Sequence, residues 1–380
     1  MSAPFRIPTH VHLTSGSFDR LPETIQGLGI RRVLLATDHG LAATAWPERA
    51  VQALRAGGAE VEVRDEIEPN PRSATIEAMA EAARDGGTEA VIGLGGGSVL
   101  DAAKAAAMLA ANPGRCEDFE GRNRFSRPSL PFIAIPTTCG TGSEVTWVSV
   151  ISVPERRAKI SVKGEGMFPR VALVDPDLLT SLPASLVATT GLDALTHALE
   201  ATTGRLANPA SDALAERAVV LLCRYLRRAA ADIGGDREAR EAVMTASTLA
   251  GFAFGNADVA GVHCLSETLG GLYDVPHGLA NAVLLAPVLR AHGEAIRPRL
   301  ASLDRAVHGE GPGEDEAAER MLQAVEALVA DLETPPFSAF RVPAEDFPEI
   351  ARRSVANGSN GSNPRVMGEP EYLEILNRLA

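Results

Sequence analysis

The N-terminal half of the chain alternates short apolar runs with segments of helical periodicity. Four segments have the apolar or alternating pattern of β-strands: Arg31–Asp38, Ala59–Glu66, Glu89–Gly95 and Leu130–Thr138. Three segments between them have the spacing of amphipathic or alanine-rich helices: Trp46–Ala56, Ile76–Arg84 and Val99–Leu109. This βαβα order predicts a parallel sheet covered by helices.

The pattern changes after about residue 145. VTWVSVISV and AKISV predict a β-hairpin, and VALVDP predicts a last strand. From Pro183 onward almost all periodicity is helical, in the segments Ser185–Ala201, Pro209–Ala231, Ala239–Ala253, Val262–Leu272 and Glu314–Leu332. Pro335, Pro336 and Asn357–Arg365 predict loops. We therefore expect an α/β domain over residues 1–182 and a helical domain over residues 183–380.

Length, charge and cysteine content indicate how many domains, which partners and which compartment to expect for this protein. A chain of 380 residues suggests about two domains. Its formal charge of −13 disfavours nucleic acid and anionic membranes as partners. No apolar run reaches the roughly 18 residues of a membrane span, no secretory leader is evident, and the four cysteines form no CxxC pair. These features predict a soluble, cytoplasmic protein with reduced thiols.

A glycine-rich turn follows the third predicted strand. Gly95, Gly96, Gly97 and Ser98 lie between this strand and the alanine-rich helix. Glycines allow close approach of a ligand to the backbone, and a helix start offers free N–H groups and a positive dipole end. This turn suits a pyrophosphate, although Ser98 could equally act as a plain helix cap.

The turn differs from the usual dinucleotide fingerprint, in which an acidic residue follows the glycines by about 20 residues. Here the candidate acid, Asp38, precedes them, at the carboxyl end of the first strand. A carboxylate there would accept from a ribose 2′-OH and repel a 2′-phosphate, which favours NAD over NADP; the alternative is a cap for the next helix. A second turn, Pro136–Thr146, is rich in small hydroxyl residues and could line the same cofactor or be a flexible turn.

Two C-terminal segments carry candidate metal ligands. Asp193 and His197 are four residues apart, on one face of a predicted helix. His263 lies on another predicted helix and His277 follows a proline-bounded turn. Each residue alone has a structural explanation, such as a hydrogen-bonded pair or a core histidine. Together, one carboxylate and three imidazoles suit Fe²⁺ or Zn²⁺ with room for a substrate oxygen.

GGGSVLDAAKA, PTTCGTGSEVT, DPDLLTSLP, TGLDALTHALEA and LGGLYDVPHGLANAVLL resemble, in this order, the signatures of the iron-containing (group III) alcohol dehydrogenase family. The resemblance covers most of the chain. It implies a dehydroquinate synthase-like architecture, with an α/β dinucleotide-binding domain, an all-α C-terminal domain and a catalytic site in the cleft between them. It also implies metal ligation by Asp193, His197, His263 and His277.

The resemblance further implies which residues contact the cofactor. The pyrophosphate loop falls on Gly95, Gly96, Gly97 and Ser98. The residues expected to line the cofactor are Asp38, Asn70, Asp101, Thr137, Thr138 and Thr141. A lysine near the nicotinamide ribose matches Lys159 best, with Lys163 as a second candidate; Lys159 could also be a solvated strand residue.

This sequence departs from the family pattern at two positions. Several relatives have histidine or an aromatic residue four positions after the third ligand, where this chain has Glu267. We expect Glu267 to face the same cleft and to hold a water or relay the alcohol proton, although it could be a solvated or capping glutamate. Cys139 stands where many relatives have a small residue, and either confers sensitivity to oxidation or simply packs.

The implied activity is NAD-linked interconversion of a small alcohol and its aldehyde or ketone, in a homo-oligomer, expected to be a dimer. The metal, as a Lewis acid, would lower the pKa of the alcohol before hydride transfer to nicotinamide. Other reactions on this scaffold stay open: maleylacetate reductase, polyol dehydrogenase and hydroxyacid–oxoacid transhydrogenase. A catalytically silent nucleotide-binding or assembly protein is the remote alternative.

Overall fold

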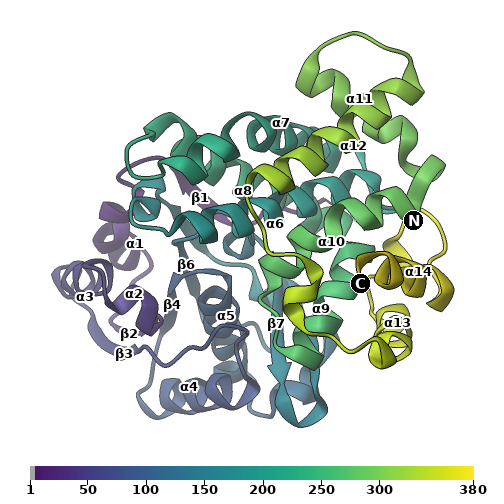
Figure 1. The fold of residues 1–380 in the computed structure, drawn as a ribbon. Coiled ribbons are helices and arrows are strands. Elements are labelled where there is room, and N and C mark those ends of the chain that lie inside the picture. The colour runs from purple at the N-terminus through teal and green to yellow at the C-terminus, as the bar shows by residue number, and fades with distance from the viewer. Residues whose placement is uncertain (1–4) are drawn as a thin grey trace. The chain divides into compact units, whose positions relative to one another are not determined.

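The computed structural model describes residues 5–380, which form two compact units. One unit is Ile7–Leu182, and the other is Pro183–Ala380 together with Phe5 and Arg6. The first contains the strands and the second is helical (Figure 1). Within the described residues, no helix combines the length and apolar character that a membrane crossing requires.

The α/β unit is built on a six-stranded sheet in which every neighbouring pair is parallel. In spatial order its strands are β1 (His10–Leu13), β9 (Val171–Val174), β6 (Phe132–Pro136), β4 (Ala90–Gly95), β2 (Arg32–Ala36) and β3 (Glu60–Arg64). The predicted parallel sheet is confirmed. Strands β4 and β6 are buried at every position, which explains their continuous apolar sequence.

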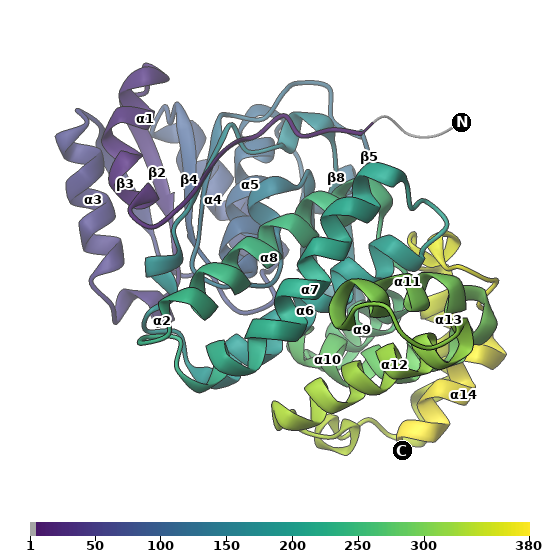
Figure 2. The same ribbon diagram turned by 90° about the horizontal axis from the view of Figure 1, so that it is seen from above.

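Helices cover both faces of this sheet. They are α1 (Leu21–Gly27), α2 (His39–Ala42), α3 (Trp46–Ala56), α4 (Ser73–Asp85) and α5 (Gly97–Ala111). Figure 2 shows α1 and α3 on one side of the strands and α4 and α5 on the other. Leu21, Ile25 and Leu54 join the core on the first side, against Leu35 and Ile92 of the sheet.

A smaller three-stranded sheet completes the α/β unit. Strands β7 (Val148–Val153) and β8 (Ala158–Lys163) pair antiparallel, which confirms the predicted hairpin, and β5 (Gly121–Arg122) pairs with β8. Strand β1 was not predicted. Its four residues, HVHL, contain too little apolar sequence for a local signal, and its pairing with β9 is a long-range contact.

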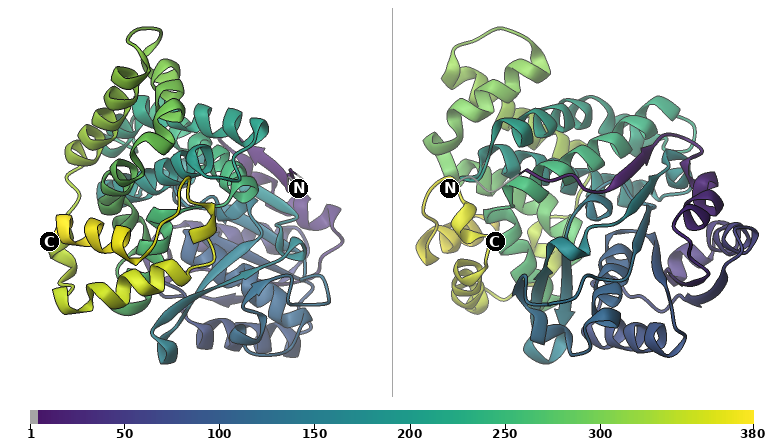
Figure 3. Two further views of the ribbon diagram at one scale, coloured as in Figure 1. Left: turned by 90° about the vertical axis from the view of Figure 1, so that its right-hand side faces the viewer. Right: turned by 180° about the vertical axis from the view of Figure 1, so that it is seen from behind.

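The helical unit contains α6 (Ala184–Thr203), α7 (Pro209–Ala231), α8 (Arg237–Ala257), α9 (Gly261–Tyr273), α10 (His277–His292), α11 (Arg297–His308), α12 (Glu314–Asp331), α13 (Phe347–Ala356) and α14 (Glu369–Leu379). Figure 3 shows them in teal to yellow, with α13 and α14 side by side. Helix α6 is central: every residue from Gly191 to Thr203 is buried, and α7, α8 and α10 pack against it.

The helices predicted from periodicity are present with bounds that agree to within four residues, whereas α10, α11, α13 and α14 were not predicted. Helix α10 is apolar around much of its circumference and contains Pro287, so it lacks a clear amphipathic pattern. The predicted loop at 357–365 is largely irregular, with one short 3₁₀ turn at Asn360–Ser362.

Candidate metal centre and cofactor loops

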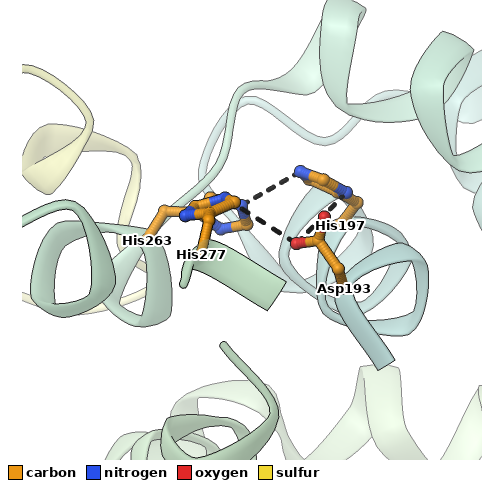
Figure 4. Close-up of side chains that lie close together, drawn as sticks. All are labelled: Asp193, His197, His263 and His277. Carbon is orange, nitrogen blue, oxygen red and sulfur yellow. Dashed lines mark hydrogen bonds and ion pairs between the residues drawn. The ribbon is translucent and has the colours of Figure 1, made fainter. Parts of the chain in front are cut away.

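Four side chains from three helices of the helical unit converge. Asp193 and His197 project from α6, His263 from α9 and His277 from the first turn of α10 (Figure 4). One ligand atom from each lies within 4.8 Å of all the others. The structure thus brings together the four residues that the sequence singled out, although they come from segments about 70 residues apart.

Local sequence explains how each helix presents its residue. Asp193 and His197 are one turn apart on α6. Pro276 precedes α10, so His277 stands at the helix start. Gly278 allows α10 to approach α6 closely, because a Cβ there would lie 2.9 Å from the carbonyl oxygen of Thr189.

Three of the four side chains in the cluster are buried, and the fourth is partly exposed. The side chains of Asp193, His197 and His263 are at most 5% exposed, whereas that of His277 is 27% exposed. His197 Nε2 and His263 Nε2 are 3.0 Å apart, and His277 Nε2 is 3.7 Å from Asp193 Oδ1. Lone-pair-bearing atoms therefore face one another around a common point.

Charge and burial oppose each other in this cluster. Burial acts to raise the pKa of Asp193, but His197, His277 and His263 lower it overall. Burial acts to lower the pKa of His263, but the carboxylates of Glu200, Asp193 and Glu267 together outweigh it, so that the pKa is raised. The site therefore stabilises an anionic carboxylate and attracts positive charge.

Three residues around the cluster were missed by the sequence analysis. Glu200 of α6 accepts from His263 Nδ1 at 2.5 Å, and Asn281 of α10 donates through Nδ2 to Asp193 Oδ1 at 2.6 Å. The ring of Phe254 stacks on that of His197, with centroids 4.1 Å apart and planes at 16°. The signal for Glu200 was available: it lies seven residues after Asp193, on the same face of α6.

Glu267 is on α9, four residues after His263, and is half-buried. Its Oε2 accepts from Asn357 Nδ2 at 2.7 Å. Glu267 is not one of the four clustered residues, but its charge contributes to raising the pKa of His263. Its role in proton transfer stays a prediction.

The glycine turn of the α/β unit packs against the second predicted turn. Strand β4 ends at Gly95, Gly96 is the N-cap and α5 begins at Gly97. A Cβ on Gly96 would meet Thr138 Cγ2 at 3.0 Å, and one on Gly97 would meet Thr141 Cγ2 at 2.3 Å. The alternative that Ser98 caps the helix is wrong, since Ser98 lies inside the first turn. Glycine at these positions is required by the neighbouring turn itself.

Asp38, Asn70 and Lys159, which were also expected to contact the cofactor, each form a hydrogen bond within the protein. Asp38 lies two residues beyond the end of β2 and caps α2 by accepting from the Leu41 N–H at 2.8 Å, as its structural alternative predicted. Asn70, which has a positive φ of 58°, accepts from Lys159 Nζ at 2.7 Å, so these two predicted residues are in contact. Lys163 lies at the far end of β8, paired with Val148.

Asp101 belongs to an internal network. Its Oδ1 accepts from Ser143 Oγ at 2.6 Å and its Oδ2 from the Val150 N–H at 2.9 Å. Lys104, which the sequence analysis did not single out, lies 3.8 Å away and is fully buried. Both oxygens of Asp101 are thus engaged by the protein. Thr137 is buried at the end of β6, and Cys139 is buried as well, which fits its packing alternative.

Comparisons with known proteins agree across the whole chain. Residues 8–176 match the family model described as iron-containing alcohol dehydrogenase, and residues 187–380 match that of the C-terminal domain of the Fe-containing alcohol dehydrogenase family. The chain is 39% identical to long-chain-alcohol dehydrogenase 1 of Geobacillus thermodenitrificans, over 92% of this chain and 89% of that protein. It is 34% identical to an NAD-dependent methanol dehydrogenase of Bacillus methanolicus, over 98% of each chain.

The structural likeness is as extensive. A crystal structure of 1,3-propanediol oxidoreductase superposes with a TM-score of 0.96 at 35% identity and covers 100% of both chains.

Proposed function

This chain belongs to the iron-containing alcohol dehydrogenase family, and we propose that Asp193, His197, His263 and His277 bind the one divalent cation on which its activity depends. The protein is an enzyme, an NAD-dependent alcohol dehydrogenase that interconverts an alcohol and its carbonyl product. The metal, its ligands and the substrate range are what we infer below.

The convergence of the four ligand atoms carries the proposal. Three imidazoles and one carboxylate around one point are an N/O donor set suited to Fe²⁺ or Zn²⁺. Neutral imidazoles and one carboxylate leave such a centre with a net charge of about +1. His263 Nδ1 faces the Glu200 carboxylate, so its Nε2 is left as the electron-pair donor, as in metal-binding histidines. The residues therefore fit a divalent cation.

A divalent cation in this position supplies Lewis acidity, which lowers the pKa of an alcohol and polarises a carbonyl group. The protein holds the four ligands and, through Asn281 and Phe254, restrains Asp193 and His197. We propose that Glu267 holds a water or relays the alcohol proton, since it lies one helical turn beyond His263. Hydride transfer itself is the chemistry of the nicotinamide.

In the α/β unit we propose that Gly95, Gly96, Gly97 and Ser98 bind the NAD pyrophosphate at the start of α5. Asp38 would accept from the adenosine ribose and disfavour NADP. Asn70, Thr137, Thr138, Thr141 and Lys159 would line the dinucleotide. The internal hydrogen bonds of Asp101 favour an indirect role, in which it supports the turn containing Ser143.

We propose a small alcohol and its aldehyde or ketone as substrates, because two of the similar proteins named above carry the names of small alcohols, methanol and 1,3-propanediol. We further propose a cytoplasmic homodimer. Buried Cys116, Cys139 and Cys264 fit a reducing compartment, and edge strands β1 and β3 leave sheet edges for a second copy. Light scattering on the purified protein tests the dimer.

The decisive experiment combines metal analysis with turnover. We expect protein purified without oxygen to contain about one Fe²⁺ or Zn²⁺ per chain and to oxidise small alcohols with NAD in preference to NADP. A chelator should abolish this activity, and Fe²⁺ or Zn²⁺ should restore it. Undiminished turnover after complete metal removal would refute the proposal.

A further inference from the structure

Glu200 is a buried carboxylate surrounded by hydrogen-bond donors. It lies on α6 one turn beyond His197, and it is 3% exposed. Its Oε2 accepts from the Ala260 N–H at 2.8 Å and faces His263 Nδ1 at 2.5 Å. Its Oε1 accepts from the Val262 N–H at 2.7 Å. One side chain of α6 thus binds both the start of α9 and the imidazole that α9 carries.

This arrangement determines which nitrogen of His263 carries hydrogen. A carboxylate only accepts, so the nitrogen facing it, Nδ1, must donate. In a neutral imidazole the other nitrogen, Nε2, then keeps its lone pair. That nitrogen is the one that lies 3.0 Å from His197 Nε2, inside the four-residue cluster. The backbone bonds to Ala260 and Val262 prevent the carboxylate from turning away.

We propose that Glu200 is a positioning residue, which holds His263 in the tautomer and orientation required for metal binding by tying α6 to the start of α9. This inference rests on the proposed function, because it takes His263 to be a ligand. It extends that function to a residue that does not touch the metal, the cofactor or the substrate.

Glutamine is the sharpest substitution at this position. It keeps the shape of glutamate but replaces one oxygen by an NH₂ group. If the NH₂ replaces Oε2, it donates to His263 Nδ1, and the hydrogen of His263 moves to Nε2, where it blocks ligation. If the NH₂ replaces Oε1, it opposes the N–H of Val262 and leaves a buried donor unsatisfied. Aspartate keeps the charge but is one methylene shorter, so it should restore part of the effect.

The test measures metal affinity and not turnover. Metal-stripped wild type, Glu200→Gln, Glu200→Asp and Asp304→Asn are titrated with Zn²⁺ against a chromogenic chelator, and the absorption spectra of their Co²⁺ forms are recorded. Asp304 is the matched control: it is a fully buried carboxylate of the same unit that binds Arg320 and His308, outside the cluster. We expect Glu200→Gln to weaken Zn²⁺ binding about 10–100-fold and to change the Co²⁺ spectrum. Asp304→Asn should lower only thermal stability.

A second measurement does not depend on a folded variant. Histidine ¹⁵N chemical shifts of Zn²⁺-loaded wild-type protein should show His263 protonated at Nδ1 and metal-bound at Nε2. An Nδ1 without hydrogen in the Zn²⁺-loaded protein, or a folded Glu200→Gln protein with wild-type affinity and spectrum, would overturn the role of Glu200. If wild type itself binds no metal tightly, the proposed function fails instead.

Discussion

The two units each bury a cluster of ionisable side chains, and the clusters are built differently. In the α/β unit, Lys104 Nζ donates to the carbonyl oxygen and Oγ of Ser143 at 2.9 and 2.8 Å and to the Val148 carbonyl oxygen at 2.7 Å. Asp101 accepts from two further donors. Burial lowers the pKa of Lys104 to about 8, with Asp101 and Glu144 opposing the shift, so the ammonium stays charged at neutral pH.

In the helical unit the atoms that meet are all of types that can act as metal ligands. Imidazole nitrogens of His197, His263 and His277 and an oxygen of Asp193 share one small volume, and only the Nδ2 group of Asn281 donates among them in the described contacts. A buried polar cluster is stable only when donors and acceptors balance. The Lys104 cluster is balanced by hydrogen bonds within the protein, whereas we propose that a bound cation balances the histidine cluster. We therefore propose that the first cluster is structural and that the second is a metal site.

The largest effect expected from this contrast is the loss of metal on removal of a ligand. His277→Ala should abolish stoichiometric metal binding and NAD-linked turnover, with a loss of affinity beyond the roughly 100-fold typical of an outer hydrogen-bond partner. His277 is the least buried ligand, so the fold should survive. Metal analysis and circular dichroism measure both. His308→Ala, another partly exposed histidine of this unit, is the control and should retain metal.

Removing Lys104 from its cluster should have the opposite result: a loss of stability without a loss of metal. Lys104→Met leaves Asp101 and the Ser143 and Val148 oxygens without their cation, which should lower the free energy of unfolding by about 3–5 kcal/mol. The metal content per folded chain should stay at the wild-type value. Denaturant unfolding and metal analysis check this pair of outcomes. Metal loss in a folded Lys104→Met protein would contradict the division between the two clusters.

Burial favours the uncharged form of a third buried group, His292. Burial lowers the pKa of His292 from 6.5 to about 4; the charge of Glu200 opposes this shift and that of Arg365 adds to it. Between pH 6.5 and 4 the unfolded chain binds a proton that the folded chain does not, so stability falls as pH falls through this window. The loss from this group should reach about 3 kcal/mol.

His292→Gln should flatten that part of the stability–pH curve, measured by denaturant unfolding at several pH values. His39→Gln is the control, because His39 is exposed and its removal should leave the slope unchanged. An identical slope in wild type and His292→Gln would show that His292 titrates normally.

The smallest effect concerns Asp38, which is already bonded to the protein and is also proposed to bind ligand. Asp38→Ala should lose the cap of α2, at a cost of about 1 kcal/mol. It should also lower the preference for NAD over NADP, because the 2′-phosphate no longer meets a carboxylate. Thermal unfolding and the ratio of kcat/KM for the two cofactors separate these effects. An unchanged ratio would leave Asp38 with the capping role alone.

The sequence by itself determined the features that depend on local periodicity and residue type. The alternation of apolar runs and helices predicted the parallel sheet, because buried parallel strands are apolar on both faces. The i, i+4 spacing of Asp193 and His197 placed them on one helical face. The rarity of histidine made His263 and His277 candidates, and their combined chemistry indicated a metal before any distance was known.

Tertiary structure decided what depends on contacts between distant segments. The strand assignment of β1 required its pairing with β9, and helix α10 has too little amphipathic pattern to be read locally. Glu200 is an ordinary glutamate until α9 places His263 and two backbone N–H groups against it. Asp101 was expected to line the cofactor, yet its oxygens are engaged by Ser143 and Val150. A side chain's partners are set by packing, which local sequence does not encode.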